Sequence, residues 1–254
     1  GDNTFYVRAR VHDKSTLPDG SVSQSSGNLS GWMSPQEFIV DGTPPVSTMT
    51  WPVNGGYASA ISSITGTANA ALSGVKRVEV RITTAPATGP DWNGTGYSFA
   101  GVPIWNQATA AANWEYTSLT NAFFTGNRYY IYSHAVDNAG NPQSPDTAFS
   151  VLYDTTVPSV SLARPAPNPA DPPYYSNNSG SPTQILLTSG TVNDNGTLPS
   201  GIVSVMIAIS SGPSETMWWN AATNLFDQPG AIFWATNVYV SGPSWSYRPA
   251  AWAT

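Results

Sequence analysis

Residues 127–153 carry the clearest alternation of apolar and polar positions in the chain, and it predicts two antiparallel strands joined by a turn. Residues 129–136 alternate with a period of two, which places one set of side chains on each face of a strand. Residues 137–142 break the alternation with Asp, Asn, Gly and Pro, which favour turns. The alternation resumes at residues 149–153. It ends in residues 154–158, because proline cannot donate to a sheet ladder.

The same pattern occurs near the start of the chain. Residues 5–13 match residues 129–137, so that Phe5 takes the place of Tyr129 and Asp13 that of Asp137. Residues 38–45 match residues 150–158, with one residue inserted. The recurrence predicts a repeat protein, in which each repeat is one structural unit.

The repeat divides the chain into three parts. Residues 44–157 form a complete domain, with strands predicted at residues 46–51, 61–68, 74–82, 97–105 and 114–116 and in the closing pair. Residues 158–254 are the N-terminal part of a second domain that lacks its last two strands; its strands at residues 159–162, 184–192 and 202–209 match the first three of the complete domain. Residues 1–43 are the C-terminal half of such a domain and contain two strands of the missing kind.

Composition supports an all-β protein and excludes several classes of function. Charged residues make up 9% of the chain, far below the usual value of about 25%, so the surface is covered mostly by Ser, Thr, Asn, Gln and Gly. The net charge of −6 and the absence of a Lys/Arg cluster argue against nucleic-acid binding. The chain has no cysteine, which excludes disulfides and thiolate metal sites. No apolar run approaches the roughly 20 residues of a membrane span.

The repeat motifs resemble those of bacterial immunoglobulin-like domains in large extracellular surface and filament proteins. The matching motifs are W-x-Y at residues 114–116, Y-x-I-x-S-x-A-x-D-N-A-G-N at residues 129–141 and D-T-T-x-P at residues 154–158. The resemblance implies tandem immunoglobulin-like β-sandwiches that form an elongated chain. It says little about function, because this scaffold hosts adhesins, stalks, filament subunits and accessory modules of secreted enzymes. The copy at residues 12–15 departs from the pattern because it lacks the A-G-N turn.

Three explanations fit the divided domain. The chain is a part excised from a longer array, or one repeat period cut at an arbitrary phase, or a subunit whose residues 1–43 complete residues 158–254 of the next by strand addition. The third arrangement is head-to-tail and propagates as an open filament. We favour the first two together. The predicted partners are therefore copies of this chain or neighbouring immunoglobulin-like domains.

No set of residues in the sequence predicts catalysis. His12 and His134 fall on outward positions of their strands and are not equivalent in the repeat. Asp91 and Glu115 could be paired as acid and base of a glycoside hydrolase, but neither has a carboxylate equivalent in the second copy. We therefore predict that the protein is not an enzyme.

Acidic and amide side chains gather at the strand ends beside the linkers. Asp137, Asn138, Asn141 and Asp154 carry the oxygen ligands that calcium prefers, and in some related surface repeats calcium stiffens such junctions. The preferred interpretation is that they cap turns, because Asp and Asn bond to their own backbone and accept left-handed geometry. Calcium at these four residues is the alternative, and no other cofactor is predicted.

Most of the tryptophans recur at equivalent positions, which favours packing over ligand binding. The equivalent pairs are Trp92 with Trp219, Trp105 with Trp234, and Trp114 with Trp245. Trp218 and Trp252 have no equivalent in the repeat and are the predicted ligand or interface residues.

The sequence thus predicts a structural or adhesive segment of an extracellular filament, stalk or surface appendage. The alternative is a carbohydrate-binding or accessory module of a secreted glycan-active enzyme, with glycans as partners. An exposed tryptophan platform would favour the alternative, and buried tryptophans would favour the first function.

Overall fold

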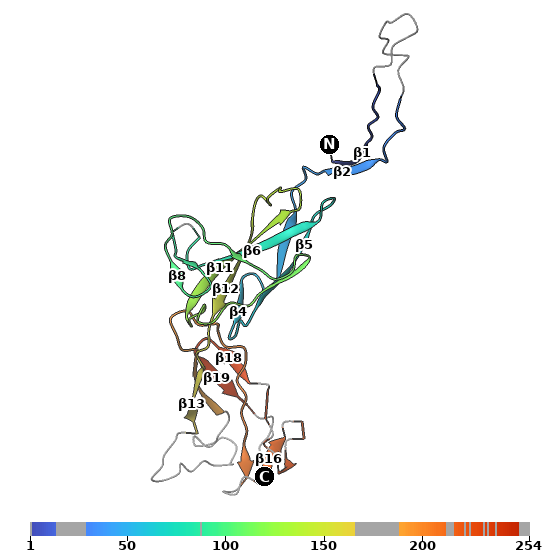
Figure 1. The fold of residues 1–254 in the computed structure, drawn as a ribbon. Coiled ribbons are helices and arrows are strands. Elements are labelled where there is room, and N and C mark those ends of the chain that lie inside the picture. The colour runs from blue at the N-terminus through green and yellow to red at the C-terminus, as the bar shows by residue number, and fades with distance from the viewer. Residues whose placement is uncertain are drawn as a thin grey trace, which may run out of the picture. The chain divides into compact units, whose positions relative to one another are not determined.

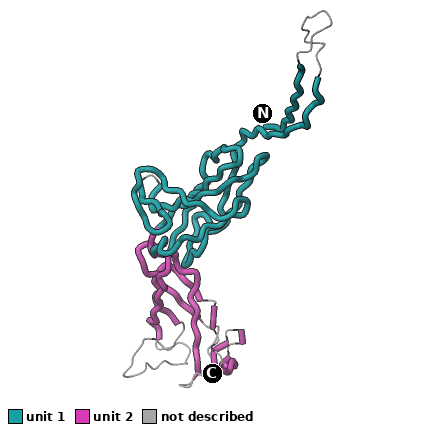
Figure 2. The backbone as a smooth tube through the Cα atoms, viewed as in Figure 1, with its two compact units in different colours: residues 1–124, 128–153 teal, residues 125–127, 154–254 magenta. Residues whose placement is uncertain are grey.

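The computed structural model describes residues 2–13, 29–86, 88–165, 188–211, 216–220, 222, 223, 225–230, 232, 234–236 and 238–248. These residues form strands, turns and loops, with no helix among them (Figure 1). The chain divides into two compact units, residues 1–124 with 128–153 and residues 125–127 with 154–254 (Figure 2). Residues 1–43, which the sequence assigns to a separate half domain, belong to unit 1 in this division.

Unit 1 begins with a two-stranded hairpin. Strands β1 (Asn3–Val7) and β2 (Gln36–Val40) pair antiparallel, with Phe5 opposite Phe38. The two phenyl rings stack with their centroids 5.5 Å apart. Within the described part of the chain no third strand joins this sheet, so both faces of the hairpin are exposed.

The rest of unit 1 consists of two sheets that face one another across one apolar core. The smaller sheet has the order β10 (Asn113–Tyr116), β5 (Ile64–Asn69), β3 (Val46–Trp51). The larger has the order β4 (Gly56–Ala58), β12 (Thr147–Tyr153), β11 (Asn127–Asp137), β6 (Val75–Thr83), β7 (Asp91–Trp92), β8 (Tyr97–Ser98), with β9 (Asn106–Gln107) beside β6. All pairs with a defined register are antiparallel except β4 with β12, which is parallel.

The core of unit 1 follows from the alternation in its strands. In β6 the side chains of Val78, Val80 and Ile82 are fully buried, as their period of two predicts. Residues of both sheets belong to the same core cluster, among them Ile64 and Trp114 from one sheet and Ile131 from the other. This arrangement is consistent with a β-sandwich.

Unit 2 is also built of strands. One sheet has the order β13 (Ser159–Arg164), β14 (Thr188–Asn193), β19 (Ser244–Tyr247), β18 (Tyr239–Ser241). The other has the order β15 (Ser210–Ser211), β16 (Met217–Asn220), β17 (Leu225–Pro229). Its core is smaller, with Val192, Val205 and Trp245 as the buried cluster.

The strand predicted at residues 202–209 is wrong. These residues are irregular except for a single bridge, Ile207 to Ala235. The equivalent strand of unit 1, β6, is long because β11 pairs with it over most of its length. No described residue provides such a partner for residues 202–209, and a strand without its neighbour has no ladder to fix it.

Candidate functional site

Two linkers in the chain are closed by the same hydrogen bonds. Asp41 accepts the N–H of Thr43 at 3.0 Å on Oδ1 and the N–H of Ser73 at 2.8 Å on Oδ2. Asp154 accepts the N–H of Thr156 at 2.9 Å on Oδ1 and the N–H of Ser200 at 2.8 Å on Oδ2. Each aspartate therefore holds its own linker and a loop that follows much later in the sequence.

The loops that meet the two aspartates also match. Ser73 and Ser200 are each followed by a glycine with positive φ, +75° at Gly74 and +96° at Gly201. This left-handed conformation favours glycine, which has no Cβ to clash with the backbone. The Ser-Gly pair is thus the local sequence that lets the loop present its serine N–H to the linker aspartate.

Three of the four predicted calcium residues lie together beside the first linker. Asp137 accepts the backbone N–H and the side-chain Nδ2 of Asn141, both at 2.8 Å. The same Nδ2 also donates to the carbonyl of Asp41 at 2.9 Å. Asn138 donates to the carbonyl of Ser73 at 2.8 Å. The fourth residue, Asp154, lies in unit 2 and is the counterpart of Asp41 rather than a member of this cluster.

The charges of these aspartates are stabilised by N–H donors. Hydrogen bonds from Ser73, then Thr43, lower the pKa of Asp41. The N–H groups of Thr156 and Ser200 lower the pKa of Asp154. Burial acts to raise the pKa of Asp137, but the hydrogen bonds from Asn141 and Gly140 outweigh it, so that this pKa is lowered as well.

This bonding supports the turn-capping interpretation. The carboxylate oxygens face N–H donors, which a cation would have to displace. Among the described residues there is no group of three or more His, Cys, Asp or Glu side chains that could hold a metal ion. Calcium at these residues stays a prediction.

Sequence reasoning missed Gln143, a buried polar residue that joins the two sheets of unit 1. Its Oε1 accepts the backbone N–H of Ser47 at 2.8 Å and the hydroxyl of the same residue at 2.7 Å. Ser47 Oγ lies 2.9 Å from Ser133 Oγ, so a residue of β3 is tied to one of β11. Gln143 Nε2 donates to Thr147 Oγ1 at 3.1 Å. The loop position of Gln143 gave no signal, because Ser47, its partner in the other sheet, is 96 residues away in sequence.

The repeat-equivalent tryptophans are mostly buried. Trp92, Trp114, Trp219 and Trp245 are 1–4% exposed. Trp92 Nε1 donates to the carbonyl of Ser118 at 2.8 Å, and Trp219 Nε1 donates to Tyr247 Oη at 3.1 Å.

The remaining tryptophans differ in exposure. Trp105 is half-buried and Trp234 is exposed. Trp218, a predicted interface residue, is buried, and its Nε1 has no hydrogen-bond partner among the described residues. Trp252 lies outside the described residues.

The carboxylates and histidines considered for catalysis lie apart. Both oxygens of Asp91 are 2.9 Å from Arg81 Nε, and Oδ2 also accepts the N–H of Ile104 at 2.9 Å. Glu115 is exposed on β10. His134 Nδ1 is 2.7 Å from Asp146 Oδ1 at a half-buried position.

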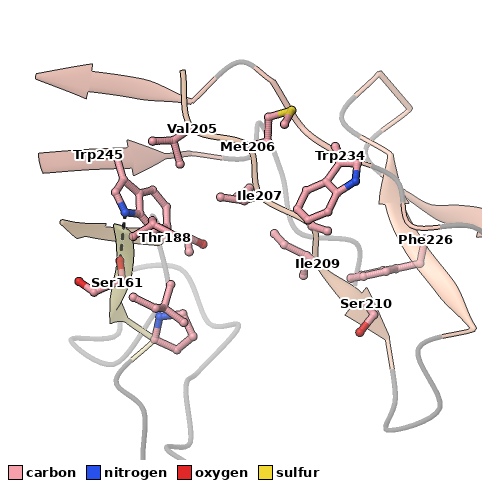
Figure 3. Close-up of a pocket in the computed structure, with 14 residues that line it drawn as sticks. Ser161, Thr188, Val205, Met206, Ile207, Ile209, Ser210, Phe226, Trp234 and Trp245 are labelled. Carbon is pink, nitrogen blue, oxygen red and sulfur yellow. Dashed lines mark hydrogen bonds between the residues drawn. The ribbon is translucent and has the colours of Figure 1, made fainter. Parts of the chain in front are cut away.

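Unit 2 contains an apolar cavity of about 680 Å³. Its lining includes Val160, Val205, Ile207, Ile209, Trp234 and Trp245. Figure 3 shows Trp245 and Ser161 at one end in this view, Phe226 and Trp234 at the other, and Ile207 between them. Trp245 Nε1 donates to the carbonyl of Ser161 at 3.0 Å, which fixes the indole at the cavity wall.

No family model matches the chain, and no curated protein matches it. One similar solved structure is described as a tetra-tandem repeat in the extending region of a large adhesion protein, with a TM-score of 0.33 and 14% sequence identity. The alignment covers 98% of this chain and 49% of that one, so this chain spans about half its length. No helix in the described part of the chain is long and apolar enough to cross a membrane.

Proposed function

We propose that this chain is a structural or adhesive segment of an extracellular filament, stalk or surface appendage built from tandem immunoglobulin-like domains, without catalytic activity. One observation carries the proposal: the linkers at Asp41 and Asp154 use the same hydrogen bonds to the same kinds of residue. A linker built twice in one chain is typical of an array made from repeated modules.

The linkers suit a mechanical role. In each, an aspartate accepts two backbone N–H groups, which restricts the backbone on both sides of the contact. Pro45 and Pro158 follow the two linkers and fix their own φ angles. Proline-containing linkers act as semi-rigid spacers in arrays of this kind. An array of such modules would hold whatever lies at its tip away from the surface that carries it.

The proposal is tested by electron microscopy of the native material that contains this chain. Regular fibres or strings of small modules are expected, with spacing that matches one domain. Dispersed globular particles in the micrographs would contradict the proposal.

Carbohydrate binding by an accessory module is the second candidate, favoured by one observation. Trp234 is 50% exposed and lines the cavity of unit 2, so it offers an aromatic face of the kind on which sugar rings stack. A glycan array probed with the chain and with Trp234→Ala separates the two functions. Glycan binding that the substitution removes would support this candidate.

A further inference from the structure

Residues 202–209 of unit 2 lack a neighbour that their counterpart in unit 1 has. In unit 1, β6 pairs with β9 through Val80 and Asn106, and also with β11. The bridge from Ile207 to Ala235 takes the place of the β9 pairing, since Ile207 is equivalent to Val80. Among the described residues nothing takes the place of β11. Val205, Ile207 and Ile209, which are equivalent to the fully buried Val78, Val80 and Ile82, instead line the cavity.

The β1–β2 hairpin has the complementary deficiency. Its sequence repeats that of the β11–β12 pair, with Phe5, Val7 and Phe38 at the positions of Tyr129, Ile131 and Val151. Those three residues of unit 1 are 0–1% exposed in the core, whereas Phe5, Val7 and Phe38 are 41%, 52% and 48% exposed. One face of the hairpin thus carries apolar side chains that are exposed, although their equivalents in unit 1 are buried in the core.

We propose that the β1–β2 hairpin of a second copy of this chain occupies the cavity of unit 2 and pairs with residues 202–209 in the register that β11 has on β6. Val7, Ala9 and Val11 then lie opposite Ile209, Ile207 and Val205, respectively. Each copy has both the hairpin and the cavity, so the contact is head-to-tail and extends into a filament. This inference builds on the proposed function and names the partner and the surfaces. It adopts the strand-addition arrangement, which the sequence alone did not favour.

Two side-chain contacts of unit 1 support the fit of this hairpin to this cavity. In unit 1, the hydroxyls of Ser47 and Ser133 bond at 2.9 Å between the sheets, and both residues are fully buried. The equivalent residues are Val160, which lines the cavity, and Ala9, which follows β1. Both members of the polar pair are therefore replaced by apolar residues, so neither is left with an unpaired hydroxyl.

The second contact involves an aromatic ring. In unit 1, Trp105 lies against the imidazole of His134 with ring centroids 5.2 Å apart. The equivalent residues are Trp234 at the cavity and Arg10 of the hairpin. A guanidinium over an indole face is a favourable pair, and Arg10 already lies 4.5 Å from the ring of Trp32 in its own hairpin. Docking exchanges one such contact for another.

Disulfide trapping tests the register directly, because the chain has no native cysteine. His134 is opposite Glu79 in unit 1, so Arg10 is expected opposite Met206. Oxidation of the variant Arg10→Cys/Met206→Cys should give a ladder of covalent multimers on a non-reducing gel. The control Arg10→Cys/Ala208→Cys, displaced by two residues, should give far less. A monomer with an internal disulfide would overturn the proposal by assigning the cavity to the hairpin of the same chain, and free thiols would overturn it by leaving both surfaces unpaired.

Point substitutions give an independent test in the cysteine-free chain. Val7→Glu places a charge on the hairpin face that enters the cavity, and we expect it to raise the concentration needed for association by at least tenfold in sedimentation experiments. Val7 is exposed in the free hairpin, so the variant should fold. Arg8→Glu, on the opposite face, is the matched control and should associate like the unchanged protein. Equal association of both variants would overturn the docking. Fibres in micrographs of the native material, together with free thiols in the oxidised Arg10→Cys/Met206→Cys variant, would overturn this inference while leaving the proposed function intact.

Discussion

The indole of Trp114 lies directly against the backbone of Gly66, its cross-strand partner in the β10–β5 pair. A Cβ on Gly66 would be 2.2 Å from Trp114 Cζ2 and 2.1 Å from the carbonyl oxygen of Thr48. Unit 2 repeats this arrangement with Trp245 and Gly190, where a Cβ would be 2.7 Å from the indole nitrogen. In both units a tryptophan is buried because the facing residue has no side chain.

We therefore expect Gly66→Ala to destabilise the protein by about 3 kcal/mol, because overpacking a filled core displaces backbone as well as side chains. The free energy of unfolding in urea, followed by tryptophan fluorescence, measures the effect. Gly96→Ala is the control, since no atom lies within 4 Å of its Cβ position. Equal stability of the two variants would mean that Trp114 does not pack as described.

Stability should fall at acid pH because of the linker and turn aspartates. The pKa values of Asp41, Asp137 and Asp154 are lowered below the ordinary 3.8 in the folded protein. Their contribution is fully present above pH 3.8 and is lost as the pH falls below it towards the folded-state values, because the unfolded chain then binds more protons. Urea unfolding at a series of pH values measures this loss. Asp154→Asn should flatten the dependence, and an unchanged profile would argue against a charged Asp154 as linker cap.

The Arg81–Asp91 pair should be worth more than a surface ion pair. Its side chains are only 14% and 6% exposed, and removing one partner leaves the other charge without compensation. We expect Asp91→Ala to cost about 3 kcal/mol of unfolding free energy. The double variant Arg81→Ala/Asp91→Ala should lose less than the sum of the single variants, because it leaves neither charge without its partner. Unit 2 has uncharged residues, Ala208 and Trp218, at the equivalent positions. Additive losses would show that the two charges do not interact.

Gln143→Leu should destabilise unit 1 by about 2 kcal/mol, because it leaves the buried N–H of Ser47 without its acceptor. Hydrogen exchange at the amide of Ser47 should become faster in the same variant. Gln107→Leu is the matched control, since Gln107 is exposed on β9. A protected Ser47 amide in Gln143→Leu would rule out the described contact.

Much of the strand pattern could be predicted from the sequence, because alternation reports directly which side chains a sheet buries. Val46–Trp51 is observed as predicted, and the strand predicted at residues 74–82 is β6, shifted by one residue. The failure at residues 202–209 has a physical cause. Apolar alternation shows that a segment can form a strand, but it does not show whether a neighbouring strand is present to pair with it.

The predicted sites depended on contacts that spacing along the chain does not reveal. Asp137 and Asn141 lie together because they share one turn, whereas residue type alone groups Asp154 with them. The partner of Asp41 lies 32 residues further on, at Ser73. A signal was present in the Ser-Gly pairs at residues 73–74 and 200–201, which recur together with the Asp-x-Thr linkers.

The parallel pairing of β4 with β12 has a consequence for a module under tension. Val151, Leu152 and Tyr153 pair with Gly56, Tyr57 and Ala58, and the chain leaves the module just after Tyr153 while it enters ahead of β3. A pull on the two ends would slide these strands past each other lengthwise. The hydrogen bonds between the two strands would then be loaded in shear and at the same time, instead of breaking one after another.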